Sequence, residues 1–241
     1  RDWSSDVCSS DLPSARDLRL MRLARTLSWI ETAGAVGAQL EEWRLRADAA
    51  AVRPACFAVP VVPGQGMPVR LEFTTDDPRG ASDWLGPFAS QRDAVNVLRG
   101  IASGNQLCLK LVGAEHADGP CSAYGTGRCR GVCAGAEDPA RHDLRLFAAI
   151  APLRLRSWPY RGAAGIREVH AGSGRTDLHV VRDWRHLGTV RDEEGLHALL
   201  ESRCDVPFRT EWYRLFGRVL DGECAGAQVI DLASATEAAV Q

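Results

Sequence analysis

The stretch "CSAYGTGRCRGVC", from Cys121 to Cys133, places three cysteines within thirteen residues. Together with Cys108 upstream, the pattern is C-x12-C-x7-C-x3-C. The surrounding segment, residues 104–136, is rich in Gly and lacks the apolar periodicity of a helix or a strand. Because such a segment buries little apolar surface by itself, another interaction must order it. This requirement constrains the fold more than any other feature of the chain.

Three interpretations of these four thiols stay open: a metal centre, disulfides, or unliganded thiols. Four thiolates are the number that a tetrahedral metal ion or an iron–sulfur cluster requires, and soft thiolates select zinc or iron–sulfur. Structural zinc sites usually combine two short C-x2-4-C pairs, whereas here only Cys129 and Cys133 form such a pair. We therefore predict a metal centre, a [4Fe–4S] cluster or alternatively Zn²⁺, held by Cys108, Cys121, Cys129 and Cys133.

The remaining cysteines of the fold and the histidines receive simpler interpretations. Cys56, Cys204 and Cys224 are isolated in the sequence and are expected to be small buried hydrophobes. The six histidines are scattered without paired ligand spacing. His179 alternates on a predicted strand, which favours a packing role over catalysis.

Residues 1–12, "RDWSSDVCSSDL", resemble the translation of a sequencing-adapter oligonucleotide and are set apart from fold reasoning. We accordingly expect an N-terminally truncated chain. Without those residues, which hold one Arg and three Asp, 28 basic and 28 acidic residues remain. This balance excludes a globally basic nucleic-acid binder but not a local basic face, and Arg128 and Arg130 are candidate phosphate contacts. No run approaches the roughly eighteen apolar residues of a membrane span, so we expect no membrane association and a cytoplasmic location, where disulfides are rare.

The spacing of apolar and turn residues predicts an α+β chain. Ser90 and Asp138 are predicted helix N-caps, the latter followed by Pro, and Pro159 is expected to end the second of these helices. Leu144, Leu146, Ile150 and Leu153 are assigned to its apolar stripe. Helices are predicted over 14–34, 35–50, 90–103, 139–158, 192–202 and 209–219, and strands over 55–62, 67–73, 165–181 (a hairpin around Gly172–Gly174), 184–190 and 227–233.

At this point several separate motifs, in order over residues 84–231, are similar to one known family. "LCLKLVGAEHADGPCSAYGTGRCRGVCAG" resembles the cysteine region of the excinuclease UvrC and of its short homologue, Cho. "LGPFASQRDAVNVLRGIA" resembles the helix that precedes those cysteines, and "LHVVRDWRHLGTV" resembles the tail of Cho-type proteins. The same tail follows the nuclease domain in fusions with a proofreading-type exonuclease similar to the DNA polymerase III epsilon subunit.

The resemblance implies a GIY-YIG endonuclease that nicks damaged double-stranded DNA in nucleotide-excision repair, with other excision-repair proteins as partners. The family's Glu binds one Mg²⁺ or Mn²⁺ ion, and "GAQLEEWRLR" aligns with the helix that carries it. Glu42 is therefore the candidate catalytic residue, with Glu41 as the adjacent alternative. The family's GIY and YIG strands and its Arg-bearing helix should lie upstream of Ser14, and its P-x-Y-N segment has no counterpart near residues 50–58. We therefore predict that this chain does not cut DNA by itself.

The same resemblance divides the chain. We expect the C-terminal part of a GIY-YIG domain over residues 13–58, followed by divergent strands and a linker over 59–83. A helix–cysteine cluster–helix module over 84–160, a small Cho-type α/β region over 161–231 and a tail over 232–241 complete the chain. Three functions follow as hypotheses: an excision-repair endonuclease, a non-catalytic DNA- or partner-binding module organised by the metal centre, and the C-terminal part of an exonuclease fusion.

Overall fold

The computed structural model describes residues 15–26, 28–49, 54–78, 83–201 and 206–232. Its contacts separate a unit Arg1–Glu31 from a unit Thr32–Gln241. The first unit contains helix α1, Ala15–Leu23, which is shorter than the helix predicted over 14–34. Leu18 and Leu23 are exposed, and short helices without a buried face gain little from tertiary packing. Leu27, within the helix predicted over 14–34, lies outside the described residues.

In the second unit, a three-stranded antiparallel sheet of order β2-β1-β3 supports the cysteine segment. Its strands are β1 (Cys56–Val61), β2 (Arg70–Thr74) and β3 (Leu85–Phe88). Helices α3 (Gln91–Gly104) and α5 (Pro139–Ile150) join the strands in one core, which contains Leu85, Leu98 and Leu146. Strand β3 was not predicted from the sequence; its four residues contain Gly and Pro, which are poor strand formers.

The helix N-caps are confirmed. The Ser90 hydroxyl accepts a hydrogen bond from the backbone N–H of Asp93, and the Asp138 carboxylate accepts one from Ala140, next to Pro139. The predicted end of α5 is wrong: the helix stops at Ile150 and a 3-10 turn, η3 (Ala151–Leu153), follows it. Pro152 lacks the N–H that would continue the α-helical ladder.

The apolar stripe assigned to α5 is confirmed at Leu146 and Ile150, which are fully buried together with His142. These three residues are four positions apart and therefore share one helix face. The assignment of Leu144 is wrong, because it lies on the opposite face and is 73% exposed.

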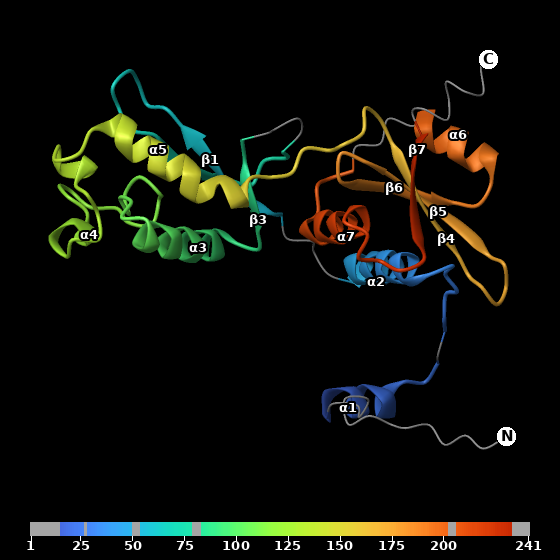
Figure 1. The fold of residues 1–241 in the computed structure, drawn as a ribbon. Coiled ribbons are helices and arrows are strands. Elements are labelled where there is room, and N and C mark those ends of the chain that lie inside the picture. Colours follow the sequence, from blue (N-terminus) through green and yellow to red (C-terminus); the bar gives the residue numbers. More distant parts are fainter. Residues whose placement is uncertain (1–14, 27, 50–53, 79–82, 202–205, 233–241) are drawn as a thin grey trace, which may run out of the picture. The chain divides into compact units, whose positions relative to one another are not determined.

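A second antiparallel sheet, of order β6-β5-β4-β7, forms the C-terminal part of the unit (Figure 1). The hairpin predicted around Gly172–Gly174 is confirmed as the β4–β5 connection. The elements are β4 (Ala164–Val169), β5 (Thr176–Arg182), β6 (Arg185–Val190), α6 (Glu193–Glu201), α7 (Thr210–Leu220) and β7 (Ala227–Asp231). Together with the first sheet they confirm the α+β fold class.

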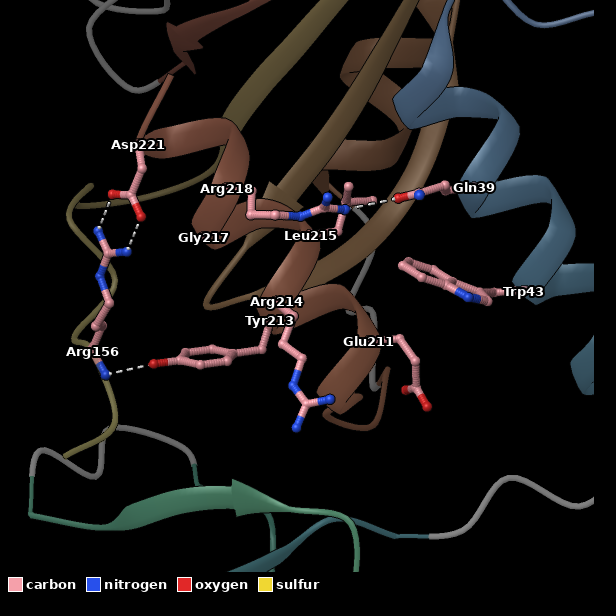
Figure 2. A pocket seen from close by; sticks show the side chains of 10 residues that line it. All are labelled: Gln39, Trp43, Arg156, Glu211, Tyr213, Arg214, Leu215, Gly217, Arg218 and Asp221. Carbon is pink, nitrogen blue, oxygen red and sulfur yellow. Dashed lines mark hydrogen bonds and ion pairs between the residues drawn. The ribbon is translucent and has the colours of Figure 1, made fainter. Parts of the chain in front are cut away.

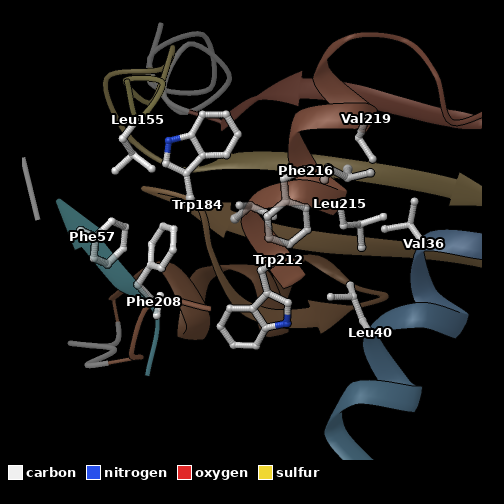
Figure 3. Close-up of a cluster of buried hydrophobic side chains, with 13 residues drawn as sticks. Val36, Leu40, Phe57, Leu155, Trp184, Phe208, Trp212, Leu215, Phe216 and Val219 are labelled. Carbon is white, nitrogen blue, oxygen red and sulfur yellow. The ribbon is translucent and has the colours of Figure 1, made fainter. Parts of the chain in front are cut away.

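Helices α2 (Ala35–Ala49) and α7 pack with this second sheet around an aromatic core (Figure 3). Val36 and Leu40 of α2 contribute one side of the core, and Phe57 of β1 reaches the same cluster. The ring of Phe57 lies edge-on to Phe208 at 5.5 Å between centroids. The other buried members are Ala55, Leu155, Ile166, Val181, Trp184, Trp212, Leu215, Phe216 and Val219.

Across the described ranges, every helix is too short or too polar to cross a bilayer.

Candidate metal centre and its surroundings

The structure brings the four predicted ligands together. The Sγ atoms of Cys108, Cys121, Cys129 and Cys133 all lie within 4.8 Å of one another. The first three residues are buried and Cys133 is half-buried. Cys108 follows the end of α3, Cys121 directly precedes the short helix α4 (Ser122–Gly125), and Cys133 lies in the 3-10 turn η2 (Val132–Ala134). Among the described residues, no other three Cys, His, Asp or Glu side chains gather in this way.

Backbone amides point at the sulfur atoms. The N–H of Cys121 donates to Sγ of Cys133 at 3.4 Å, and the N–H of Gly131 donates to Sγ of Cys129 at 3.3 Å. Gly131 has φ 89°, and a Cβ at this position would meet a ring carbon of Tyr124 at 2.5 Å. Gly131 is therefore required both by its left-handed conformation and by the close approach of the ring.

The environment of the thiols disfavours four thiolates that have no cation between them. Burial raises the pKa of Cys108 far above its usual range, with further increases from the charges of Cys121 and Cys133, against backbone hydrogen bonds from Leu111 and Lys110. Burial also raises the pKa of Cys129 to about 11. The pKa of Cys121 is lowered: burial raises it, but hydrogen bonds from the backbone of Leu109 and from the other three thiols outweigh burial. A soft cation at the centre would stabilise all four thiolates, so the donor set fits a thiolate-bound metal.

A zinc ion and a [4Fe–4S] cluster require different distances between the four sulfur atoms. In a tetrahedral zinc site, Zn–S bonds of about 2.3 Å place the sulfurs about 3.8 Å apart. A [4Fe–4S] cluster places its thiolates further apart, because the irons lie between the cluster centre and the cysteine sulfurs. The limit of 4.8 Å therefore accommodates a single ion directly, whereas a cubane requires the four sulfurs to move outward.

A buried histidine lies behind Cys108. The backbone N–H of Cys108 donates to Nε2 of His142 at 3.3 Å, and Nδ1 of His142 lies 3.4 Å from Oδ1 of Asp143. Since Nε2 accepts, the ring proton is on Nδ1 and faces Asp143. The same Asp143 oxygen accepts a hydrogen bond from the N–H of Val69, next to β2, at 3.0 Å. His142 thus connects the first cysteine to the supporting sheet.

The two predicted DNA contacts lie on the exposed rim of this centre. Arg130 is exposed, and its Nε donates to the side-chain oxygen of Gln106 at 3.0 Å. Arg128 is also exposed and, with Arg99, lines a cavity of about 290 Å³ beside α4. Both guanidinium groups are therefore accessible to an anionic partner.

Glu42 is separate from the cysteine cluster. It lies on α2, its side chain is 52% exposed, and its Oε1 is 2.6 Å from Nη2 of Arg46 one turn later. The alternative, Glu41, pairs with Nε of Arg44 at 2.8 Å. Neither carboxylate belongs to a group of metal-ligating side chains within the described part of the chain.

Comparison with known proteins shows the family of this chain. A family model described as the UvrC/Cho excinuclease middle domain matches residues 65–152, and one described as the excinuclease Cho C-terminal domain matches residues 163–236. Excinuclease Cho of Escherichia coli (strain K12) is 30% identical over 219 residues, which cover 88% of this chain and 72% of the relative. The chain belongs to the excinuclease Cho family. Excinuclease Cho of Salmonella typhimurium is also 30% identical, over 227 residues covering 88% of this chain and 73% of the relative. No solved structure matches the chain significantly.

The four cysteines lie within the match to the Cho middle domain, whereas Glu42 precedes both matched ranges.

The match to the Cho C-terminal domain contains a buried polar cluster that the sequence did not predict. Glu168 and Asp177 are each 2% exposed and His179 is 1% exposed. Strand alternation was the available signal, because Glu168 has the same parity as the buried Ile166 and Ala164.

This cluster holds the first turn of α2. The two oxygens of Glu168 accept hydrogen bonds from the backbone N–H groups of Val36 at 2.9 Å and Gly37 at 2.8 Å. His179 lies between Glu168, at 3.1 Å, and the hydroxyl of Thr189, at 2.8 Å. We call Glu168, Asp177 and His179 the α2 clamp.

Asp177 extends the clamp by accepting a hydrogen bond from the N–H of Ala33 at 2.9 Å. Its carboxylate is also paired with Arg175 and Arg191. A carboxylate at a helix N-terminus satisfies donors that have no partner in the helix and opposes the positive end of its dipole. The Cho C-terminal region therefore fixes the helix that carries Glu42.

The other described cysteines and His179 lie outside the cysteine cluster. Cys56 is buried in the core as predicted, and Cys224 is half-buried. Cys204 lies outside the described residues. His179 is buried, and its ring is hydrogen-bonded to Glu168 and Thr189 within the α2 clamp.

Proposed function

We propose that this Cho-family chain binds damaged double-stranded DNA as part of an endonuclease of nucleotide-excision repair, which hydrolyses a phosphodiester bond at the damaged site. The observation that supports this most is the four-thiol centre with Arg128 and Arg130 exposed at its rim. Guanidinium groups bind backbone phosphates without reading sequence, which suits an enzyme that acts on distortion. Other excision-repair proteins are the proposed protein partners, and the cytoplasm is the proposed location.

The metal centre is proposed to be a [4Fe–4S] cluster held by the four cysteines. The uneven ligand spacing supports this choice. Zn²⁺ is the second candidate, and the close approach of the sulfurs favours it. In either case the centre neutralises the thiolates and orders residues 104–136, so that the rim arginines are held toward the DNA.

Glu42 is proposed as the ligand of a catalytic Mg²⁺ or Mn²⁺. Carboxylate oxygens are preferred by these hard cations, and a bound cation offsets charge on the scissile phosphate. The exposure of Glu42 leaves it accessible to metal and DNA once its contact with Arg46 is released. The second candidate function is a non-catalytic DNA-binding module organised by the metal centre. The division into modules over residues 13–58, 59–83, 84–160, 161–231 and 232–241 remains part of this proposal.

DNA binding is tested by fluorescence anisotropy with a labelled duplex at several salt concentrations. Replacing Arg128 and Arg130 by Gln should weaken binding and lower the salt slope by about 0.9 for each phosphate that the variant no longer neutralises. Arg167→Gln, an exposed arginine on β4, is the matched control. If the double variant and the control bind alike, the cysteine rim is not the surface that binds DNA.

The identity of the metal is tested on anaerobically purified protein. A [4Fe–4S] cluster gives a brown protein with broad absorbance at about 400 nm and iron and sulfide in equal amounts. Colourless protein with stoichiometric zinc would instead establish the second candidate. For the catalytic assignment, the protein is assayed for Mn²⁺-dependent nicking of the duplex. Glu42→Ala should abolish the nicking, and an unchanged rate would reject Glu42 as the metal ligand.

A further inference from the structure

A groove of about 600 Å³ lies between helices α2 and α7 (Figure 2). Trp43 and Gln39 line it from α2, and Leu215, Arg214, Arg218 and Glu211 line it from α7. The four α7 residues follow one another at positions i, i+3, i+4 and i+7, so they form one stripe along the helix. The groove is distinct from the cysteine centre and from the two rim arginines.

The charges along the groove are unequal. Arg156 and Asp221, at one end, neutralise each other through two hydrogen bonds of 2.8 and 3.0 Å. Arg218 donates to the side-chain oxygen of Gln39 at 3.3 Å, which is a neutral partner. Arg214 is exposed on the same stripe, one turn earlier.

Two acidic residues line the groove, Asp221 and Glu211, and Asp221 is the one already paired with Arg156. Glu211 therefore lies in the groove with Arg214 and Arg218. The groove thus has a net positive charge once the neutralised pair is set aside. It is complementary to an anion that can approach Arg214 and Arg218 together.

Trp43 gives the groove an aromatic wall opposite α7. Its side chain is partly buried against the core, so one part of the indole is held by packing while another part lines the groove. Leu215 is buried to 2% exposure and forms an apolar floor. An aromatic wall beside cationic groups is the combination that binds unstacked nucleotides, because bases stack on the ring while the arginines contact phosphate.

We propose that this groove binds one nucleotide of a DNA strand whose base has left its stack, with the base on Trp43 and the adjoining phosphate on Arg214 and Arg218. This rests on the proposed function and deepens it, because it assigns recognition of local DNA distortion to a particular surface. Trp43 directly follows Glu42 on α2, so a strand held here lies beside the helix that carries the proposed catalytic ligand.

The test compares two labelled duplexes of the same length, one fully paired and one containing a single unpaired thymine. Trp43→Leu keeps apolar contact with the core but removes the aromatic face. It should weaken binding of the bulged duplex about tenfold, which corresponds to a stacking free energy of ~1.4 kcal/mol, and leave the paired duplex within about twofold. Trp43→Phe should restore most of the preference, and urea unfolding of both variants verifies that the core is retained.

The charged side of the groove is tested in the same assay. Replacing Arg214 and Arg218 by Gln should weaken binding of the bulged duplex, Glu211→Gln should strengthen it, and Arg167→Gln should leave it unchanged. Equal affinities of wild type and Trp43→Leu for the bulged duplex, or equal losses on both duplexes, would overturn the groove assignment.

Failure of the groove is distinguishable from failure of the proposed function. If the Arg128 and Arg130 variants lose affinity while the Trp43 and α7 variants do not, DNA binding stands and the groove assignment is rejected. If the wild-type chain binds neither duplex, both proposals are rejected.

Discussion

Removing the carboxylate of Glu168 tests whether the C-terminal region holds α2 in place. In Glu168→Ala the backbone N–H groups of Val36 and Gly37 lose their acceptors, and His179 loses one of its two partners. Glu168 is 2% exposed, so water replaces the lost carboxylate poorly. We expect this single change to destabilise the unit that begins at Thr32 and to loosen the first turn of α2.

The magnitude follows from the groups left without partners. A buried donor without an acceptor costs about 1–3 kcal/mol, and two such donors remain after the substitution. Removal of one member of a buried charged network typically costs ~3–5 kcal/mol, which agrees with that sum. Glu168→Gln retains one acceptor oxygen but places an amide NH₂ where the second oxygen was, so we expect a smaller loss of about 1–2 kcal/mol.

The assay is urea unfolding followed by tryptophan fluorescence, because Trp184 and Trp212 are buried in the core that α2 completes. The free energy of unfolding is obtained by linear extrapolation for wild type and both variants. Hydrogen exchange at the amides of Val36 and Gly37 reports the local effect, and protection there should fall more than the global stability does.

Glu42→Ala is the matched control, since it removes a carboxylate from the same helix at an exposed position that pairs only with Arg46 in the described structure. An exposed pair of this kind contributes less than about 1 kcal/mol. If Glu168→Ala and Glu42→Ala change the free energy of unfolding equally, or if Val36 and Gly37 keep their protection, the α2 clamp does not exist in solution.

Three further outcomes are expected. Cys129→Ser should reduce bound metal well below stoichiometry, because a hydroxyl is a poor ligand for a soft metal, whereas Cys224→Ser, outside the centre, should leave metal content unchanged. Gly131→Ala should also lower metal occupancy, because an alanine there adopts a left-handed φ beside the Tyr124 ring at a cost of about 1–3 kcal/mol. Gly125→Ala is the control, since a Cβ at Gly125 meets open space and should leave occupancy unchanged. Equal occupancy in the two variants would contradict the role of the turn at Gly131. The pKa of Asp177 is lowered: burial raises it, but hydrogen bonds from Arg191, the N–H of Ala33 and Arg175 outweigh burial. The contribution of the Asp177 carboxylate to stability is therefore complete above the ordinary carboxyl pKa and is lost as the pH falls through the lowered pKa of the folded state. The free energy of unfolding of the wild type should thus drop below a pH of about 4, and it should drop less steeply in Asp177→Asn.

The sequence predicted helices best where local chemistry fixes a boundary. Ser90 and Asp138 were correct because an N-cap hydrogen bond involves residues only two or three positions apart. The end of α5 was wrong because the stop came from Pro152 and not from the later Pro159. Strand β3 was missed because Leu85–Phe88 forms a strand only through pairing with β1, which is distant in sequence.

The gathering of the four thiols was predictable because three of them lie within thirteen residues, in a segment that buries little apolar surface by itself. The support behind it was not predictable: nothing in the sequence places His142, 34 positions from Cys108, beneath the backbone of that cysteine. The α2 clamp was missed for the same reason, since Glu168 meets Val36 across 132 residues.

By itself, the sequence determined the helix N-caps and the α+β class and grouped the four cysteines, because each depends on residue type and local spacing. Glu42 came from the resemblance to a known family and stays a prediction. Only the tertiary structure decided which distant groups meet. It brought the four sulfurs within 4.8 Å, seated α2 on two buried carboxylates of the second sheet, and placed Trp43 opposite the arginines of α7. The physical reason is that burial and hydrogen-bond satisfaction depend on long-range packing, which local sequence patterns do not encode.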